Sequence, residues 1–194
     1  EMMRLFNRNQ AIVFTTIQFY RTGRNQYLRE CFRDAQHGEY FIGVKLVRGA
    51  YMDKERERAT ELNYRDPIQP SKNDTDSAFN DALEFCIKHL NRVSICCGSH
   101  NEQSCLYLTR LMQKHELSHE DSRVYFSQLL GMSNHISYNL AKHGYNVAKY
   151  VPYGPVKEVV PYLIRRAQEN KSISGQTSRE LSLIQAETKR RRIS

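Results

Sequence analysis

"FIGVKLVRGAY", residues 41–51, joins a run of apolar residues to a group of polar ones, and this junction decides the fold class. The run "FIGVKLV" is almost continuously apolar, without alternation between apolar and polar residues. That pattern is typical of a parallel strand whose two faces are both buried. The stretch from Lys45 to Tyr51 carries three polar side chains, those of Lys45, Arg48 and Tyr51, so we expect chemistry where this strand ends.

The same order, an apolar β-rich run followed by a turn and a helical pattern, occurs five times. The strands are predicted at "AIVFTTIQ" (11–18), "FIGVKLV" (41–47), "RVSICCG" (92–98), "RVYFSQL" (123–129) and "NVAKYV" (146–151). Serial βα units indicate a parallel sheet, either doubly wound or closed as a (β/α)8 barrel. The chain contains neither GxGxxG nor a Walker loop, and this favours the barrel.

The helix that follows the second predicted strand begins only after a long loop. A polar loop, roughly residues 61–74, follows the second strand and contains Pro67 and Pro70. Apolar residues at helical spacing then run from Phe79 to Leu90. We expect Asp74 or Asp76 to be the N-cap of this helix, because a side-chain carboxylate can accept from the first free backbone N–H groups.

Each predicted strand ends on polar or titratable residues. They are Gln18, Lys45 to Tyr51, Ser99 to Asn101, Gln128 and Tyr150. A single such residue is most simply explained as a loop side chain that bonds its own backbone. Five groups at the same end of the strands favour an active site, because barrel enzymes place their chemistry there.

Two adjacent arginines occur in "PYLIRRAQEN", residues 161–170. A helix turns ~100° per residue, so Tyr162, Arg165, Arg166 and Glu169 share one narrow face. One interpretation is a solvated face with i,i+3 and i,i+4 ion pairs. The other is a clamp for a carboxylate or phosphate, which two guanidinium groups bind through bidentate hydrogen bonds.

The composition leaves several partners open. The 194 residues suffice for one domain, and the net charge of +8 raises nucleic acid or an anionic membrane surface as partners. Much of that charge lies in "KRRR", 189–192. However, no helix-turn-helix, zinc-finger or RNP motif is present, so we expect no nucleic acid. No run approaches the ~18 apolar residues of a membrane span.

The cysteines and histidines do not indicate a framework or a metal site. Five cysteines are an odd number without CxxC spacing, so we interpret them as reduced thiols. Two of the seven histidines, His115 and His119, form an HxxxH pair, but a zinc site needs at least three protein ligands, and no metal is expected.

Four stretches resemble the proline dehydrogenase family of flavin enzymes. They are "KLVRGAY" (45–51), "GSHN" (98–101), "YFSQLLGM" (125–132) and "KYVPYGPVKEVVPYLIRRAQEN" (149–170). The resemblance implies an α/β fold, a distorted (β/α)8 TIM-like barrel that holds FAD above its strand ends. The five units here are similar to the last five of that barrel and its closing helix. Residues 1–175 would then be the C-terminal part of the flavin-binding barrel in a longer protein, and 176–194 a basic tail.

The resemblance also implies roles for single residues. The substrate set comprises Arg165 and Arg166 on the proline carboxylate, Tyr150 and Tyr162 on the proline ring, and Leu129 in the pocket wall. The cofactor set comprises Gln18, Lys45, Arg48, Gly49, Ala50, Ser99, His100 and Glu169. Lys45 would also be catalytic, because a cation near flavin N5 stabilises negative charge on the reduced ring. Met52 stands where some relatives carry an aromatic residue, which leaves a stacking role there in doubt.

The implied reaction is the FAD-dependent oxidation of L-proline to Δ1-pyrroline-5-carboxylate, with hydride transfer from C5 to flavin N5. Electrons would pass to a quinone, with a peripheral membrane association. The location would be cytoplasmic or at the inner membrane in a bacterium, and the matrix side of the mitochondrial inner membrane in a eukaryote. The alternatives are a hydroxyproline dehydrogenase, an inactive fragment, and a basic binding protein. The sequence predicts no oligomeric state.

Overall fold

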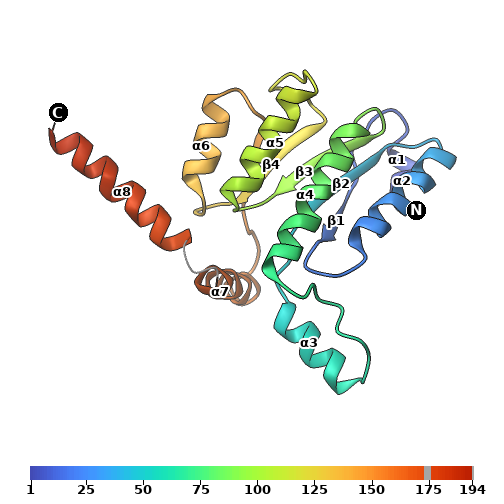
Figure 1. Cartoon of the computed structure of the whole chain (residues 1–194), viewed down its shortest axis with the longest axis horizontal. Helices are drawn as coiled ribbons and strands as arrows, with labels where there is room; N and C mark the ends of the chain where they lie inside the picture. The colour runs from blue at the N-terminus through green and yellow to red at the C-terminus, as the bar shows by residue number, and fades with distance from the viewer. Residues whose placement is uncertain (173–175, 194) are drawn as a thin grey trace. The chain divides into compact units, whose positions relative to one another are not determined.

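The computed structural model describes residues 1–172 and 176–193, with side chains described for 1–166 and 181–191. It divides into two compact units, Glu1–Lys149 and Tyr150–Ser194, which are treated separately below. Figure 1 shows the elements in chain order.

The first unit alternates strands and helices. Its elements are α1 (Met2–Phe6), β1 (Phe14–Gln18), α2 (Arg24–His37), β2 (Ile42–Val47), α3 (Met52–Glu61), α4 (Lys72–Lys88), β3 (Val93–Gly98), α5 (Glu102–Lys114), β4 (Val124–Leu129), α6 (Asn134–Lys142) and most of β5 (Val147–Tyr150). All five predicted strands are therefore confirmed, and each of them ends within one residue of the predicted position.

The strands form one sheet in the order β1-β2-β3-β4-β5. The first four pair in parallel, with Lys45 of β2 beside Thr16 of β1 and Cys96 of β3. The backbone N–H of Phe126 donates to the carbonyl of Asn146, just before β5, at 2.9 Å. A doubly wound sheet would reverse its order at a switch point. The unreversed order therefore confirms an α/β fold of the barrel type, of which this chain forms part.

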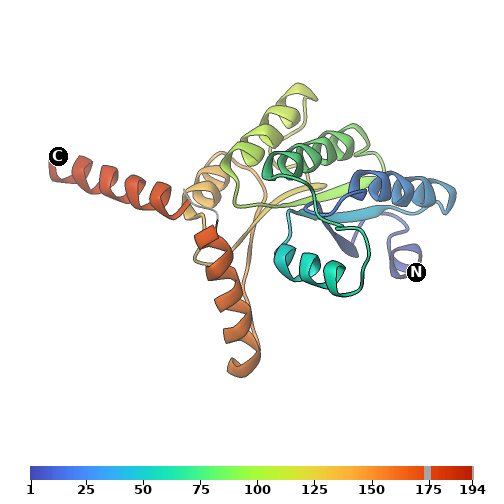
Figure 2. The ribbon, with the colours of Figure 1, turned by 60° about the horizontal axis from the view of Figure 1, so that its bottom comes forward.

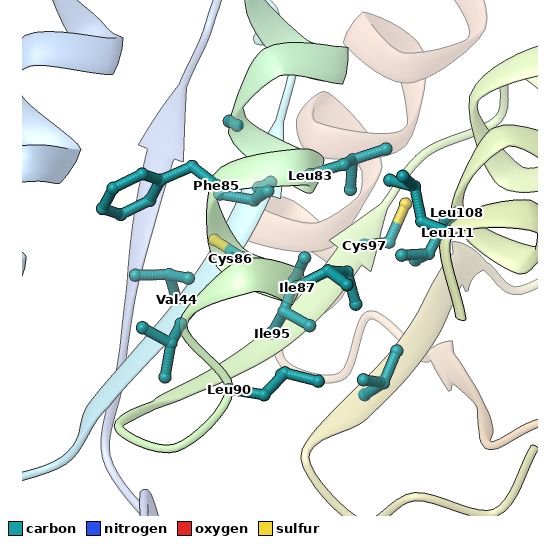
Figure 3. Close-up of a cluster of buried hydrophobic side chains, with 14 of the residues drawn as sticks. Val44, Leu83, Phe85, Cys86, Ile87, Leu90, Ile95, Cys97, Leu108 and Leu111 are labelled. Atoms are coloured by element: carbon teal, nitrogen blue, oxygen red, sulfur yellow. The ribbon is translucent and has the colours of Figure 1, made fainter. Parts of the chain in front are cut away.

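Helices α2, α4 and α5 lie side by side over one face of the sheet (Figure 2). The core fills the space between these two layers. Figure 3 shows Val44, Ile95 and Cys97 from the strands against Leu83 of α4 and Leu90 just after it, with Leu108 of α5 nearby. These side chains are at most 5% exposed. The continuous apolar runs of the sequence thus supply one wall of a core that the helices complete.

The structure corrects one predicted feature and adds another. The N-cap of α4 is Ser71, whose Oγ accepts from the backbone N–H of Asp74 at 3.2 Å. The predicted caps, Asp74 and Asp76, are wrong because both lie inside the helix. In addition, α3 lies before the predicted polar loop and meets it only at Glu61, in a stretch for which the sequence predicted no element. Its weak signal has a simple cause, since Ala59 is its one buried residue.

The described residues of the second unit form two helices. Helix α7 (Val156–Ser172) contains Pro161, and α8 (Gln176–Ile193) includes the basic run 189–192. The residues expected to form a basic tail are therefore helical over 176–193. Within the described part of the chain, no helix is both long and apolar enough to span a bilayer.

Candidate active site

The face of the sheet turned away from the helices carries Lys45 and Cys96 at paired positions. Their neighbours along the strands, such as Leu46 and Cys97, are fully buried on the helical side. Lys45 is partly buried and extends across β3, because a Cβ added at Gly98 would lie 3.1 Å from the Lys45 Cε. Burial raises the pKa of the Cys96 thiol, and the nearby Lys45 cation acts in the opposite direction. The Lys45 side chain thus lies beside Gly98 of β3, where a larger residue would crowd it.

Arg48 ties four elements together at the end of β2. Its Nε donates to Asp76 Oδ1 at 2.6 Å, Nη1 to Ser99 Oγ at 2.9 Å and Nη2 to Ser104 Oγ at 2.8 Å. The guanidinium carbon lies 4.4 Å from the ring centroid of Phe79. An arginine has five N–H donors, so these three bonds leave two for an anion. The predicted role of Arg48 at the cofactor is compatible with this geometry and stays a prediction.

Gly49 has no room for a side chain. Its φ is +117°, and an added Cβ would lie 1.5 Å from Cδ1 of Tyr20. The family resemblance placed Gly49 in the cofactor set. In the structure, the aromatic ring of Tyr20 fills the space that a Cβ would need. Ala50 follows at the same strand end and is partly buried.

Gln18 ends β1 within a small polar network. The Tyr20 hydroxyl lies 3.2 Å from the Gln18 side-chain amide and is also hydrogen-bonded to the Glu55 carboxylate. Glu55 forms an ion pair with Arg21, with 3.3 Å between Arg21 Nε and Oε2. Burial raises the pKa of Tyr20, and the bond to Glu55 raises it further, so the phenol keeps its proton at neutral pH.

Ser99 and His100 end β3 and reach towards different neighbours. The buried Ser99 hydroxyl accepts from Arg48 and from the backbone N–H of Asn101 at 3.0 Å. His100 Nδ1 lies 2.9 Å from Ser133 Oγ. Burial lowers the pKa of His100 to about 4, with a contribution from Lys149, so the imidazole is neutral at pH 7.

The structure gives Gln128 and Ser133 supporting contacts that the sequence did not predict. Gln128 is 2% exposed, donates through Nε2 to the Ser99 carbonyl at 3.1 Å and accepts from Ser137 Oγ at 2.9 Å. Ser133 begins α6 with a left-handed φ of 50°. Nothing in the sequence around Ser133 marks it. Gln128 was visible as a polar strand end, but not as a support for Ser99.

Of the predicted substrate residues, Leu129 lies in the first unit, at the end of β4, and is 8% exposed. The others lie in the second unit. There the rings of Tyr150 and Tyr162 meet edge to face with centroids 6.0 Å apart. The Arg166 guanidinium lies 5.2 Å from the Tyr162 ring centroid. These contacts bring two rings and one guanidinium into a single cluster.

Arg165 lies next to that cluster along α7. Its Nε is buried and makes no hydrogen bond within the described part of the chain. Glu169 lies on α7, but its side chain is outside the described residues. An arginine nitrogen withdrawn from water without a protein partner is what a site for an external anion requires.

A parallel sheet with unreversed strand order and polar strand ends defines a βα-barrel protein, and solved structures agree. The chain has a TM-score of 0.83 to proline utilization A from Bdellovibrio bacteriovorus inactivated by N-propargylglycine, at 23% identity over 92% of this chain and 19% of that one. A bifunctional proline utilization A protein gives a TM-score of 0.75 at 23% identity, covering 84% of this chain and 16% of that one. These likenesses establish the fold.

Sequence relatives identify the family. A proline dehydrogenase family profile matches residues 1–179. The mitochondrial proline dehydrogenase 1 of Drosophila melanogaster is 40% identical, and that of Homo sapiens is 42% identical, each over 98% of this chain. A hydroxyproline dehydrogenase of Bos taurus is 40% identical over 92% of this chain and 40% of its own length. The chain belongs to the proline dehydrogenase family, and it spans 30% and 32% of the length of the first two relatives.

Proposed function

We propose that this chain supplies the substrate clamp and part of the flavin site of an FAD-dependent enzyme that oxidises L-proline to Δ1-pyrroline-5-carboxylate. The cluster of Tyr150, Tyr162 and Arg166, with Arg165 beside it, carries this proposal. Proline combines a small apolar ring with a carboxylate. Aromatic faces suit the ring, and guanidinium groups suit the carboxylate through charge-assisted hydrogen bonds.

The strand ends of the first unit fit a flavin. A flavin cofactor has a planar ring with polar edges and an anionic diphosphate, so it needs polar groups at a flat surface and at least one cation. Gln18, Lys45, Arg48, Ser99 and His100 provide such groups, and Gly49, Ala50 and Glu169 belong to the same proposed set. When bound, FAD supplies the acceptor for the two electrons and the hydrogen that leave C5 of proline.

The protein's own contribution is orientation and charge. The Lys45 cation favours added negative charge on a neighbouring ring. Neutral His100 and the supported Ser99 offer hydrogen bonds without adding a charge. Holding two reactants in register can contribute ~7–11 kcal/mol to lowering a barrier. These residues therefore position the reactants and need not form a covalent intermediate.

The remaining parts of the proposal concern context. We propose residues 1–175 as the C-terminal part of the barrel and 176–194 as a basic segment. The reduced enzyme would pass electrons to a quinone at a membrane surface. Relatives from several animals have "mitochondrial" in their names, and this supports a mitochondrial location.

The proposal is tested by replacing Arg165 and Arg166 in turn with Met in the complete protein. Leaving a desolvated carboxylate without a partner costs ~2–5 kcal/mol, so KM for proline should rise at least ~30-fold. Bound flavin per chain should stay near the wild-type value. Lys157→Met, an exposed cation on the same helix, is the matched control and should change little. Unchanged proline KM in both arginine variants would favour the solvated-face interpretation.

A second candidate substrate is 4-hydroxyproline, because a hydroxyproline dehydrogenase is among the relatives. Tyr150 decides between the two in our proposal. A phenol ring packed against a bare methylene leaves no room for a hydroxyl, so we expect a preference for proline. The measurement is the ratio of kcat/KM for the two substrates in the wild type and in Tyr150→Ser. The ratio should fall in the variant, and a wild type that prefers hydroxyproline would reverse the assignment.

A further inference from the structure

The phenol of Tyr20 has one hydrogen and two neighbours that could accept it. One neighbour is the Glu55 carboxylate, and the other is the Gln18 side-chain amide at 3.2 Å. An ionised carboxylate can only accept, and Glu55 forms an ion pair with Arg21. Both contacts can therefore be hydrogen bonds only if the amide donates to the phenol oxygen.

The carboxylate takes the hydrogen because hydrogen bonds to a charged acceptor are about twice as strong as neutral ones. The Tyr20 oxygen is then left as an acceptor for Gln18. The oxygen and nitrogen of an amide are nearly the same size, so the hydrogen-bond network decides which of them faces Tyr20. In the structure, Oε1 of Gln18 is the amide atom that lies 3.2 Å from the Tyr20 hydroxyl. The hydrogen-bond network favours the exchanged orientation, with the NH2 group of Gln18 on the phenol and its carbonyl oxygen turned the other way.

Tyr20 is held firmly enough to impose this orientation. It is 1% exposed, and its ring fills the space above Gly49. Its backbone N–H donates to the Arg48 carbonyl at 2.7 Å, and its carbonyl accepts from the N–H of Gln69 at 2.7 Å. The phenol oxygen is thus a fixed point, and Glu55 in the first turn of α3 sets the direction of its hydrogen.

We propose that Glu55 and Tyr20 are positioning residues that make Gln18 present a hydrogen-bond acceptor, its carbonyl oxygen, to an N–H group of the flavin. This inference rests on the proposed function. The oxidised isoalloxazine ring has a single N–H, at N3, between two carbonyl groups. An amide free to turn could bind either kind of group, whereas one fixed by Tyr20 and Glu55 selects the N–H.

The test compares FAD with 3-methyl-FAD, in which a methyl group replaces that hydrogen. Apo protein of the complete chain is titrated with each flavin, and Kd is read from flavin fluorescence, without turnover. Wild-type protein should bind FAD ~10-fold more tightly, since one hydrogen bond contributes ~1–1.5 kcal/mol. In Glu55→Gln, the new amide can donate to the Tyr20 oxygen and release the phenol hydrogen to Gln18. Gln18 then presents NH2, and the preference for FAD should fall to within ~3-fold.

Two further variants show whether 3-methyl-FAD binds more weakly because of the hydrogen-bond network or only because its methyl group is bulky. Tyr20→Phe keeps the ring over Gly49 and removes only the phenol oxygen, which leaves the Gln18 amide free to turn, so the preference should lie between those of the wild type and Glu55→Gln. Arg21→Gln removes the ion pair but leaves the bond between Tyr20 and Glu55, so the preference should persist. Equal binding of both flavins by the wild type, or an undiminished preference in both Glu55→Gln and Tyr20→Phe, would overturn the inference alone. Binding of neither flavin by the wild type would overturn the proposed function and this inference with it.

Discussion

At the scale of single residues, Gly49 shows how a motif glycine can serve the fold. Gly49→Ala should lower the free energy of unfolding by ~3 kcal/mol or more, because backbone strain adds to overpacking against Tyr20. Gly131 is the matched control. Its φ is +81°, and nothing lies within 4 Å of an added Cβ, so Gly131→Ala should cost only ~1–2 kcal/mol. Urea denaturation of the complete protein measures both, and equal losses would contradict the packing argument.

Asp76 predicts a pH dependence. Burial alone would raise the pKa of its carboxyl, but hydrogen bonds from Lys72 at 2.7 Å and Arg48 at 2.6 Å outweigh burial and lower it. A lowered folded-state pKa gives stability that is present above the unfolded-state pKa, 3.8, and is lost as pH falls through the lower folded-state pKa. The bonds between Asp76 and its two cations therefore stabilise the fold most above about pH 5.

The check is the free energy of unfolding of the wild type and of Asp76→Asn between pH 7 and pH 3. Their difference should be largest at pH 7 and shrink below about pH 4. Asp81→Asn, at an exposed position of the same helix, controls for the loss of a surface charge. A difference that stays constant with pH would show that Asp76 does not act through its charge.

At the scale of elements, the start of α4 depends on one hydroxyl. Ser71 Oγ accepts from the Asp74 backbone N–H, so Ser71→Ala should lower the free energy of unfolding by ~1 kcal/mol. Ser77, exposed inside the same helix, is the matched control. Ser77→Ala should be neutral or slightly stabilising, because alanine has the higher helix propensity. Thermal unfolding measures both, and an equal effect would show that Ser71 does not cap the helix.

At the scale of the whole molecule, β1 and β5 are the outer strands of the described sheet. An open edge leaves strand N–H and C=O groups without partners, and a barrel needs a closed sheet. We therefore predict that these 194 residues, expressed alone, do not bind FAD stoichiometrically. Visible absorbance per mole of purified chain is the measurement. One tightly bound FAD per chain with proline turnover would contradict the prediction.

Sequence reasoning was most effective where burial follows a simple pattern. The continuous apolar runs located all five strands, although only β2, β3 and β4 are mostly buried in the structure, and β1 and β5 are partly exposed. The strand-end residues and "KLVRGAY" were found because the ends of parallel strands meet at one edge. Sequence reasoning did not predict α3, whose charged sequence buries only Ala59, and it placed the N-cap of α4 at the wrong residue.

The sequence by itself determined the strands, the family and the residue types of the candidate site. Only the tertiary structure decided which polar atoms meet. Arg48 bonds to Asp76, Ser99 and Ser104, which lie 28, 51 and 56 positions away along the chain. Tyr20 likewise meets Glu55 across 35 positions. The physical reason is that periodicity records which side of an element is buried, whereas a hydrogen bond depends on atoms that different elements bring together when the sheet and helices pack.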